Sequence, residues 1–335
     1  MHLLIYNLHK KVDLRPIYRY NINSRLHIKI QERNDYMVYT VTFNPALDYT
    51  LNTDNLKNGT GVINRAKTAD LHYGGKGINV SAVLTMLGVP NKALGFVAGF
   101  TGRELESLLN ADNINCDFIR LEQGQTRINV KIKSDDEMEI NAPGPEIGDD
   151  DIEKLMSKLG KMDSGDFLVL SGSVPKNLPA DIYEQILSKL EGKDIKVIVD
   201  ATGSLLTETL KHKPFLIKPN RTELGEIFNT EIKTGTDVDN YAAELQRMGA
   251  QNVLVSLSKN GAMLLDESGK IHRVSAIKGK RVNSVGCGDS MVAGFIAGYI
   301  NTNDFEYALK LGNACGGATA FSEALASKEE LAKYI

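Results

Sequence analysis

The chain has 335 residues, of which 42% are hydrophobic and 24% charged, and its formal net charge is −3. This composition is typical of a globular protein with a substantial core, and it gives no sign of nucleic acid or another polyanion as a partner. Because no apolar run approaches the length of a membrane span, and the three cysteines are widely spaced without a CxxC pair, we expect a cytoplasmic protein without a disulfide framework or zinc site.

Residues 1–36 differ in composition from the rest of the chain. They contain no Gly or Ala, and they carry seven Lys and Arg against three acids, a net charge of +4. Such a segment is a targeting arm, a surface for a partner, or an extension translated from upstream of a start at Met37. We favour the extension, because the segment has little Ser and no clear helical stripe. One folded domain is therefore expected over residues 37–335.

From Met37 onward the pattern becomes regular and begins with β structure. Residues 38–43 alternate β-branched and aromatic side chains, which predicts a strand that stops at Asn44-Pro45. Further strands are predicted at 49–53, 66–73, 92–98, 118–121, 127–133 and 138–141, with helices at 77–87 and 103–110. We expect the strands near 47–73 and 117–141 to form a small β excursion from the main domain.

Beyond Pro145 helices and strands alternate. Helices are predicted at 149–159, 179–190, 203–211 and 236–248, strands at 167–171, 195–199, 215–218 and 253–257, and then a hairpin at 262–274, a helix after Gly286 and a helical region from Phe305. This alternation, with nearly all-apolar strands, predicts an α/β fold with a mostly parallel sheet covered by helices on both faces. Ligands bind beyond the carboxyl ends of such strands, so the loops there are the expected site.

The motif VGCGDS stands at the start of a predicted helix. Gly286, Cys287 and Gly288 precede Asp289, and the free backbone N–H groups of a helix start form an anion site. A carboxylate beside that anion is suited to taking a proton from a hydroxyl. By itself the motif is explained equally well as a strand-to-helix turn.

Two stretches offer polar groups to a small ligand. Asp48 is predicted to end a turn after the first strand. Two interpretations are open: its carboxylate accepts hydrogen bonds from a polyol ligand, or it has only a structural role in the turn. In GGKGIN, glycines let the backbone approach a ligand, and Lys76 and Asn79 add a cation and an amide. Its spacing matches neither a Walker loop nor a dinucleotide-binding fingerprint.

The stretch TRINVK places three polar side chains on one face of a strand. Arg127, Asn129 and Lys131 follow the two-residue period of strand side chains. Two cations and an amide suit a phosphate, and the alternative is an exposed edge strand with solvated charges.

The stretch KPNRTE follows the strand at 215–218. Asn220 and Glu223 are one helical turn apart and offer hard oxygen ligands suited to Mg²⁺, directly or through water. The same two residues fit a capping box, and the two interpretations are compatible. Together with the anion site and its carboxylate, these groups predict a phosphoryl transferase that acts on a phosphorylated acceptor.

These motifs resemble those of the PfkB-type, ribokinase-like carbohydrate kinases from Met37 to the C-terminus. GGKGIN is similar to the family's N-terminal signature and VGCGDS to its C-terminal signature, in the expected order. TFNPALD, GGKGINVS, TRINVKI and INAPGP look most like the 1-phosphofructokinases, which make fructose 1,6-bisphosphate from fructose 1-phosphate and ATP. Tagatose-6-phosphate kinases are the nearest siblings. A non-catalytic sugar-phosphate sensor is the alternative of another class, and it would be expected to lack the base or the metal pair.

The resemblance implies a ribokinase-like three-layer α/β/α sandwich in which the β excursion is a lid over the sugar and often a dimer contact. Asp289 would be the base, with the amides of Gly286, Cys287 and Gly288 as the anion hole. Asp48, Gly74, Gly75 and Asn79 would hold sugar hydroxyls, with Lys76 and Arg127 near the acceptor's phosphate. ATP would contact Lys218, Asn220, Glu223, Ser256, Ser258, Gly261 and Asn313, with Asn220 and Glu223 organising Mg²⁺.

Two residues depart from the family's usual pattern. Cys287 stands where Ala or Ser is usual, and Ser258 stands where Gly is usual. An anion hole made of backbone N–H groups tolerates the first change, but oxidation or alkylation of the thiol is expected to block phosphate binding. The second change is expected to shift the nucleotide loop slightly.

Overall fold

The computed structural model describes residues 36–54, 56, 62–134 and 137–335. The predicted N-terminal extension, apart from Tyr36, lies outside the described residues. Within the described part, no helix is long and apolar enough to cross a membrane.

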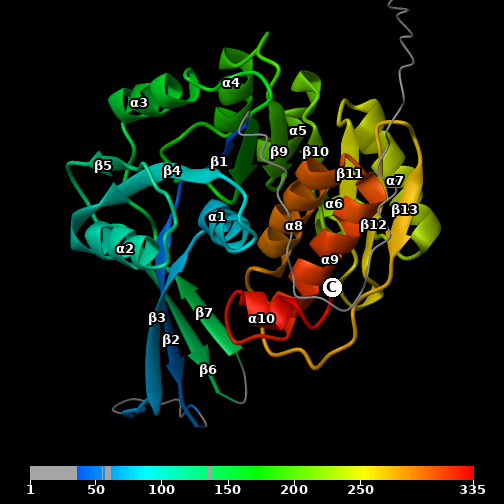
Figure 1. Ribbon diagram of the computed structural model, residues 1–335. Helices are drawn as coiled ribbons and strands as arrows, with labels where there is room; N and C mark the ends of the chain where they lie inside the picture. The colour runs from blue at the N-terminus through cyan, green and yellow to red at the C-terminus, as the bar shows by residue number, and fades with distance from the viewer. Residues whose placement is uncertain (1–35, 55, 57–61, 135–136) are drawn as a thin grey trace, which may run out of the picture.

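A large sheet forms the middle layer of the molecule (Figure 1). Within the described residues it has nine strands, in the spatial order β13-β12-β11-β10-β9-β8-β1-β4-β5. In chain order these are β1 (Val38–Thr42), β4 (Asn91–Ala98), β5 (Ile119–Leu121), β8 (Phe167–Ser171), β9 (Lys196–Asp200), β10 (Leu216–Ile217), β11 (Asn252–Ser256), β12 (Ala262–Leu265) and β13 (Ile271–Val274). The pairs from β5 to β11 are parallel, whereas β12 pairs antiparallel with both β11 and β13.

Helices cover both faces of this sheet. One face packs against α1 (Lys76–Met86), α2 (Gly99–Ala111), α8 (Cys287–Thr302) and α9 (Phe305–Ala320), with the short α10 (Lys328–Leu331) beside them. The other face packs against α3 (Asp149–Leu159), α4 (Ile182–Lys189), α5 (Ser204–Thr207), α6 (Arg221–Ile227) and α7 (Gly235–Arg247). The predicted three-layer α/β/α sandwich is therefore confirmed.

A second sheet projects from one end of the molecule and forms the lid (Figure 1). Its strands are β2 (Ala46–Asn52), β3 (Thr68–Gly74), β6 (Arg127–Lys133) and β7 (Glu137–Asn141), in the order β3-β2-β6-β7. The predicted lid segment near 117–141 began too early, because β5 pairs with β4 in the large sheet. Only the part from Arg127 belongs to the lid.

Three other predictions differ from the structure in ways that have local causes. The helix predicted at 203–211 is split into α5 and the 3₁₀ turn η1 (Leu210–His212), where the Thr209 hydroxyl donates to the Leu206 carbonyl at 2.6 Å and competes with helical hydrogen bonds. The strand predicted at 215–218 shrinks to Leu216–Ile217, and it cannot extend beyond Phe215 and Lys218 because Pro214 and Pro219, which have no N–H groups, follow on either side. The helix predicted at 179–190 begins only at residue 182.

Small residues bring α8 close to α9. A Cβ added at Gly298 would lie 2.7 Å from the Ala308 Cα, and one added at Gly312 would lie 2.7 Å from the Met291 carbonyl oxygen. Larger side chains would push the helices apart. This contact matters for function because α8 begins at the VGCGDS motif.

Candidate active site

The candidate site lies at the carboxyl ends of the central strands, beneath the lid. β9 ends at Asp200, and Lys218 directly follows β10. α1 and α8 pack against each other and begin at the GGKGIN and VGCGDS motifs. Two motifs about 200 residues apart in the chain therefore meet at one edge of the sheet, as is expected of loops that follow parallel strands.

The start of α8 has the geometry of an anion site. Gly286 is the N-cap residue and has a left-handed backbone with φ 77°, so a side chain there would be strained. An added Cβ would also lie 2.6 Å from the Leu325 side chain. The backbone N–H groups that follow in the first turn have no partner within the helix, and the helix dipole adds positive potential.

Asp289 is buried at this helix start, with 5% of its surface exposed. Its Oδ2 accepts a hydrogen bond from Asn79 Nδ2 at 2.8 Å, which links α8 to α1. Burial, and then the charge of Asp200, raise the pKa of Asp289 to about 6, although Lys76, Asn79 and Lys218 oppose the rise. A carboxylate with a raised pKa is well matched to accepting a proton near neutral pH.

Asp200 organises the cations of the site. Its Oδ1 accepts hydrogen bonds from Lys76 Nζ at 3.3 Å and Lys218 Nζ at 3.1 Å, and the residue is 1% exposed. Burial alone would raise the pKa of Asp200, but the two ammonium groups hold it below its ordinary value. Its Oδ2 is buried without a hydrogen-bond partner in the described structure.

The two lysines lie beside the anion site. A Cβ added at Gly288 would lie 3.1 Å from Lys218 Nζ, so this ammonium group rests against the start of α8. Burial opposes the charge of Lys76, but Asp200, Asp289 and Glu223 together raise its pKa. Both side chains therefore bring a cationic group close to the helix start that would hold an anion.

The lid presents a polar inner face to the site. Asp48 accepts a hydrogen bond from Asn129 Nδ2 at 2.9 Å and pairs with Lys131 Nζ at 2.7 Å. The prediction that Arg127, Asn129 and Lys131 share one face of a strand is confirmed by the register of β6 with β2. The prediction that Asp48 ends a turn is wrong: it lies inside β2, because only Asn44-Pro45 interrupts the backbone after β1.

Arg127 and Gly74 lie at the base of the lid. Burial lowers the pKa of Arg127, although the charge of Asp48 opposes this, and its Nε is buried without a hydrogen-bond partner in the described structure. Gly74 is paired with Ala46, and a Cβ there would lie 2.7 Å from the Asp48 carboxylate. Gly75, the N-cap residue of α1, has φ 117°, a conformation that favours glycine.

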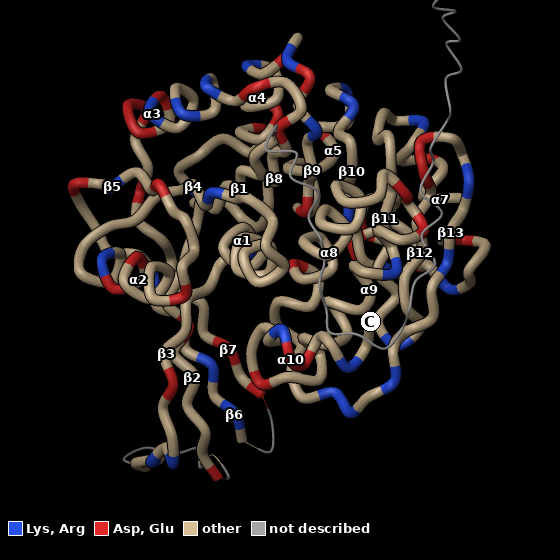
Figure 2. The backbone as a smooth tube through the Cα atoms, in the orientation of Figure 1, with Lys and Arg blue, Asp and Glu red and all other residues tan. Residues whose placement is uncertain are grey.

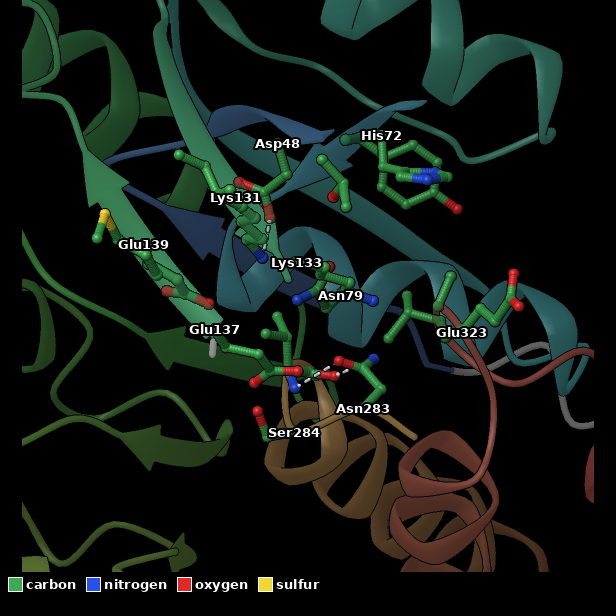
Figure 3. A pocket seen from close by; sticks show the side chains of 18 of the residues that line it. Asp48, His72, Asn79, Lys131, Lys133, Glu137, Glu139, Asn283, Ser284 and Glu323 are labelled. Atoms are coloured by element: carbon green, nitrogen blue, oxygen red, sulfur yellow. Dashed lines mark hydrogen bonds and ion pairs between the residues drawn. The ribbon is translucent and has the colours of Figure 1, made fainter. Parts of the chain in front are cut away.

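A cavity of about 290 Å³ lies between the lid and the start of α8 (Figure 3). On the lid side it is lined by Asp48, His72, Lys131 and Lys133, with Glu137 and Glu139 from β7. Opposite them lie Asn79, residues 283–286 and residues 323–325. Its size and mixed polar lining suit a small, hydroxylated anion.

Asn220 and Glu223 form the capping box that the sequence allowed. Asn220 Oδ1 accepts from the N–H groups of Thr222 and Glu223 at 2.8 and 2.9 Å, and Glu223 Oε2 accepts from the Asn220 N–H at 2.8 Å. Within the described residues, no cluster of three or more His, Cys, Asp and Glu side chains is arranged to hold a metal ion.

The predicted nucleotide residues lie on β11, the turn that follows it, and α9. Ser256 ends β11 beside Asn220, to which it is bridged, while Ser258 begins the 3₁₀ turn η2 (Ser258–Asn260) that ends at Gly261. Ser258 has φ 53°, a left-handed conformation that explains why glycine is favoured there. Asn313, on α9, donates to the Ser275 carbonyl at 3.0 Å, and a Cβ added at Gly261 would lie 2.7 Å from the carbonyl carbon of the same Ser275.

The Cys287 thiol is half-buried. Burial and the nearby Asp289 raise its pKa to about 11, so the thiol is protonated at neutral pH and a poor nucleophile. Its alkylation is therefore expected to be slow.

One residue of the buried cluster, Asp200, was not singled out in the sequence. The available signal was a carboxylate at the carboxyl end of the apolar strand KVIVD, at the edge where ligands bind. Its two lysine partners lie 124 and 18 residues away in the chain, so no local pattern joined them.

Curated proteins similar to this chain are sugar-phosphate kinases. A 1-phosphofructokinase of Bacillus subtilis is 42% identical over 88% of this chain and 95% of its own length. A D-tagatose-1-phosphate kinase of Bacillus licheniformis is 37% identical over 88% and 96%. A tagatose-6-phosphate kinase of Staphylococcus epidermidis is 34% identical over 86% and 93%.

Solved structures share the fold. Phosphofructokinase-2 of Escherichia coli, in complex with substrates and products, is 29% identical with a TM-score of 0.83, covering 89% of this chain and 97% of that one. Ribokinase of Arabidopsis thaliana, at 22% identity and a TM-score of 0.72 over 89% and 97%, has the same overall fold. The family model for pfkB family carbohydrate kinases matches residues 41–330. The chain therefore belongs to the pfkB family of carbohydrate kinases, and it is a 1-phosphofructokinase-like phosphotransferase with the ribokinase-like fold.

Proposed function

We propose that this kinase transfers the γ-phosphoryl group of ATP to fructose 1-phosphate, giving fructose 1,6-bisphosphate. The observation that carries the proposal is a cavity that joins the start of α8 to a polar lid face, which bears Lys131 and Lys133 as well as the carboxylates of Asp48, Glu137 and Glu139. A sugar phosphate in that cavity can meet a buried carboxylate with its hydroxyl end and cations with its phosphate end. The similarity to a 1-phosphofructokinase at 42% identity supports this substrate.

We assign the proton transfer to Asp289. Its carboxylate takes the proton of the acceptor hydroxyl as the oxygen attacks the γ-phosphorus and the bond to ADP breaks. The N–H groups of Gly286, Cys287 and Gly288 hold the transferring phosphoryl oxygens. Loss of Asp289 would mark a non-catalytic sensor, and its presence argues against that alternative.

We divide the cations between the two phosphates. Arg127 and Lys131, on the lid, are assigned to the acceptor's phosphate. The sequence assigned Lys76 there as well, but its contact with Asp200 and its nearness to Glu223 favour the phosphoryl-transfer path. Lys218, against Gly288, is given the same role.

Sugar hydroxyls are assigned to Asp48, Gly74, Gly75 and Asn79. The Asp48 carboxylate is fixed by Asn129 and Lys131, and Asn79 lines the same cavity. The glycines allow the ligand to approach the backbone closely.

The family uses ATP, and we propose that Mg²⁺ accompanies it. The orphaned Oδ2 of Asp200 and the hard oxygens of Glu223 fit such a cation, and both residues act on Lys76. Asn220 Oδ1 already accepts two backbone N–H groups, so we assign it contact through water. When bound, the ion neutralises charge on the nucleotide's phosphates. Ser256, Ser258 and Gly261 would contact the nucleotide, with Asn313 near the adenine.

We further propose that two copies of the chain pair through the outer face of the lid. That face exposes Tyr49, Leu71, Ile128 and Ile140, whose exposed fractions run from 37 to 56%. Contiguous exposed apolar side chains of this kind mark interaction surfaces.

The three free cysteines support a reducing, cytoplasmic setting for the enzyme.

The test is an ADP-release assay across five acceptors: fructose 1-phosphate, D-tagatose 1-phosphate, tagatose 6-phosphate, fructose 6-phosphate and free fructose. We expect the highest kcat/KM with fructose 1-phosphate. A clear preference for one of the two tagatose phosphates would mean that the enzyme is the corresponding tagatose-phosphate kinase, and a lack of turnover with all five acceptors would overturn the proposal.

Arg127→Ala is expected to raise KM for the sugar phosphate, with little change for free fructose, because it removes a phosphate contact.

A further inference from the structure

The carboxylate of Asp48, which is assigned to a sugar hydroxyl, already has two protein partners. Its Oδ1 accepts a hydrogen bond from Asn129 Nδ2 at 2.9 Å, and its Oδ2 forms an ion pair with Lys131 Nζ at 2.7 Å (Figure 3). Asp48 and Lys131 both line the cavity, and each side chain is 14% exposed. A sugar hydroxyl that donates to Oδ2 therefore has to compete with an ammonium group, which is a stronger, charged donor.

The ion pair runs diagonally across the lid. Lys131 lies directly opposite Thr50 on β2 and Glu139 on β7, whereas Asp48 lies opposite Asn129. Figure 2 shows Lys and Arg on β6 next to Asp and Glu on β7. Although the Glu139 carboxylate is the nearer one in the register of the strands, the Lys131 side chain reaches along the sheet to Asp48, which only a long side chain can do. Its ammonium group is thus directed toward the base of the lid.

Arg127 lies at that base, on the same face of β6, and it forms no ion pair with a residue that the structure describes. Its Nε is buried without a hydrogen-bond partner among those residues. The charge of Asp48 reaches Arg127, because it raises the pKa of Arg127 against the larger effect of burial. A phosphate group bound by Arg127 would therefore come within range of the Lys131 ammonium group.

A sugar phosphate would offer Lys131 a stronger partner than Asp48 does. A phosphate monoester carries a charge of about −1.5 to −2 near neutral pH. It therefore attracts an ammonium group more strongly than a single carboxylate at the same distance. Because both ends of the ion pair line the cavity, Lys131 can turn from one anion to the other without becoming a buried, unpaired charge. A free sugar has no phosphate and would leave Lys131 on Asp48.

We propose that Lys131 determines specificity for phosphorylated sugars by an exchange of partners. It holds Asp48 Oδ2 until the phosphate of the acceptor draws it away, and Oδ2 then accepts the sugar hydroxyl. The inference rests on the proposed roles of Asp48 and Lys131 toward a sugar phosphate, and it adds a link between them. Phosphorylated acceptors are preferred because they release Asp48, in addition to the direct phosphate contact.

A purely structural ion pair predicts a different result. If Lys131 served only to keep Asp48 in place, its removal would misplace the carboxylate and weaken every acceptor. If Lys131 competes with the sugar hydroxyl, its removal weakens the sugar phosphate but improves the free sugar. The two roles therefore differ in the sign of the effect on a free sugar.

The test compares Lys131→Met with wild type on free fructose and on fructose 1-phosphate. Methionine keeps a long, unbranched side chain without the charge. The matched control is Lys133→Met, two residues further along the same face of β6. Lys133 also lines the cavity, but it forms no ion pair with a described residue. Melting temperatures are measured for both variants, and the kinetics are compared for folded protein.

We expect Lys131→Met to raise kcat/KM for free fructose by about three- to fivefold, the upper range for an ion pair that keeps some contact with solvent. The same variant should lower kcat/KM for fructose 1-phosphate about tenfold, because a charged phosphate contact is lost. Lys133→Met should show no gain on free fructose. A Lys131→Met variant without a gain on free fructose, or an equal gain in Lys133→Met, would overturn the proposal.

A second measurement does not depend on the stability of a variant. Inorganic phosphate, added to wild type with free fructose at saturating ATP, supplies the anion that free fructose lacks. It should stimulate phosphorylation of free fructose by wild type but not by Lys131→Met. No stimulation of wild type, or equal stimulation of the variant, would contradict the exchange of partners.

The choice of acceptor is tested separately, by the turnover of fructose 1-phosphate by wild type. If a tagatose phosphate proves to be the better acceptor, the same comparison is made with free tagatose. Binding of the free sugar, followed by NMR titration in wild type and Lys131→Met, gives the ratio of affinities without turnover. Equal affinities would count against the exchange whichever sugar phosphate the enzyme prefers.

Discussion

The chemistry that we propose for this kinase depends on one carboxylate, whose neighbours act on its charge in opposite directions. Asp289 is buried, repelled by Asp200 and attracted by Lys76. We predict that Asp289→Asn lowers turnover by ~10² to 10⁴-fold, the usual cost of losing a general base, with substrate binding largely kept. The variant should also melt no lower than wild type, because an amide removes a buried charge whose folded pKa is raised. Single-turnover kinetics and calorimetric binding are the measurements, and undiminished turnover would rule out the assigned base.

Asn79 tunes the same carboxylate. Its amide donates a hydrogen bond to ionised Asp289, which favours the charged form. Asn79→Ala should therefore raise the pKa of Asp289, and the acid limb of kcat/KM, expected near pH 6 in wild type, should move up by about half to one unit. Activity is lost as pH falls because protonated Asp289 cannot accept a proton.

A matched control separates this effect from damage to sugar binding. Asn129→Ala also removes an amide from a site carboxylate, but that carboxylate is Asp48 on the lid. Asn129→Ala should lower kcat/KM without shifting the acid limb of its pH profile. Comparing variants on one substrate cancels the titration of the substrate's own phosphate. If the acid limb of the Asn79→Ala variant stayed at the wild-type pH, the proposed effect of Asn79 on the pKa of Asp289 would be contradicted.

At the scale of elements, the position of Asp289, the proposed base, depends on how closely α8 packs against α9. Replacing a helical glycine by alanine usually stabilises a helix by up to ~1 kcal/mol. At Gly298 the added Cβ would lie 2.7 Å from the Ala308 Cα, a backbone atom that cannot move aside. We predict that Gly298→Ala destabilises the protein by about 1–3 kcal/mol.

The control for this prediction is Gly235→Ala. Gly235 begins α7, and an added Cβ there meets nothing within 4 Å. Urea unfolding should show this variant within about 0.5 kcal/mol of wild type. If Gly298→Ala were as stable as Gly235→Ala, the close contact of α8 and α9 would not be a constraint.

For the whole molecule, the lid separates two surfaces by alternation along its strands. Asp48 and Lys131 face the cavity, while Tyr49 and Ile140 face outward. We predict a dimer in solution, and Ile140→Glu should convert it to a monomer, because a carboxylate would be buried unpaired in the contact. Met248→Glu, at a 41% exposed site at the end of α7, should leave the dimer intact. Sedimentation velocity measures the oligomeric state of wild type and both variants. A monomeric wild type would contradict the proposed lid contact.

Several features were determined by the sequence alone, because they depend on neighbours in the chain. Strand alternation assigned Arg127, Asn129 and Lys131 to one face, and the run of apolar strands and helices predicted the three layers. The Asn220 and Glu223 capping box, a contact over three residues, was also readable locally. For Ser258 the sequence showed only that Ser stands where the family usually has Gly, and the left-handed φ of this residue came from the structure.

Other features were decided by the tertiary structure, because they join residues far apart in sequence. Asn79 meets Asp289 across 210 residues, and Lys76 meets Asp200 across 124. Asp48 lies within a strand and forms an ion pair with Lys131. The helix predicted at 203–211 is interrupted where the Thr209 hydroxyl donates to the Leu206 carbonyl. A local pattern cannot specify such pairs. They form because parallel strands bring their carboxyl ends, and the charges that follow them, to the same edge of the sheet.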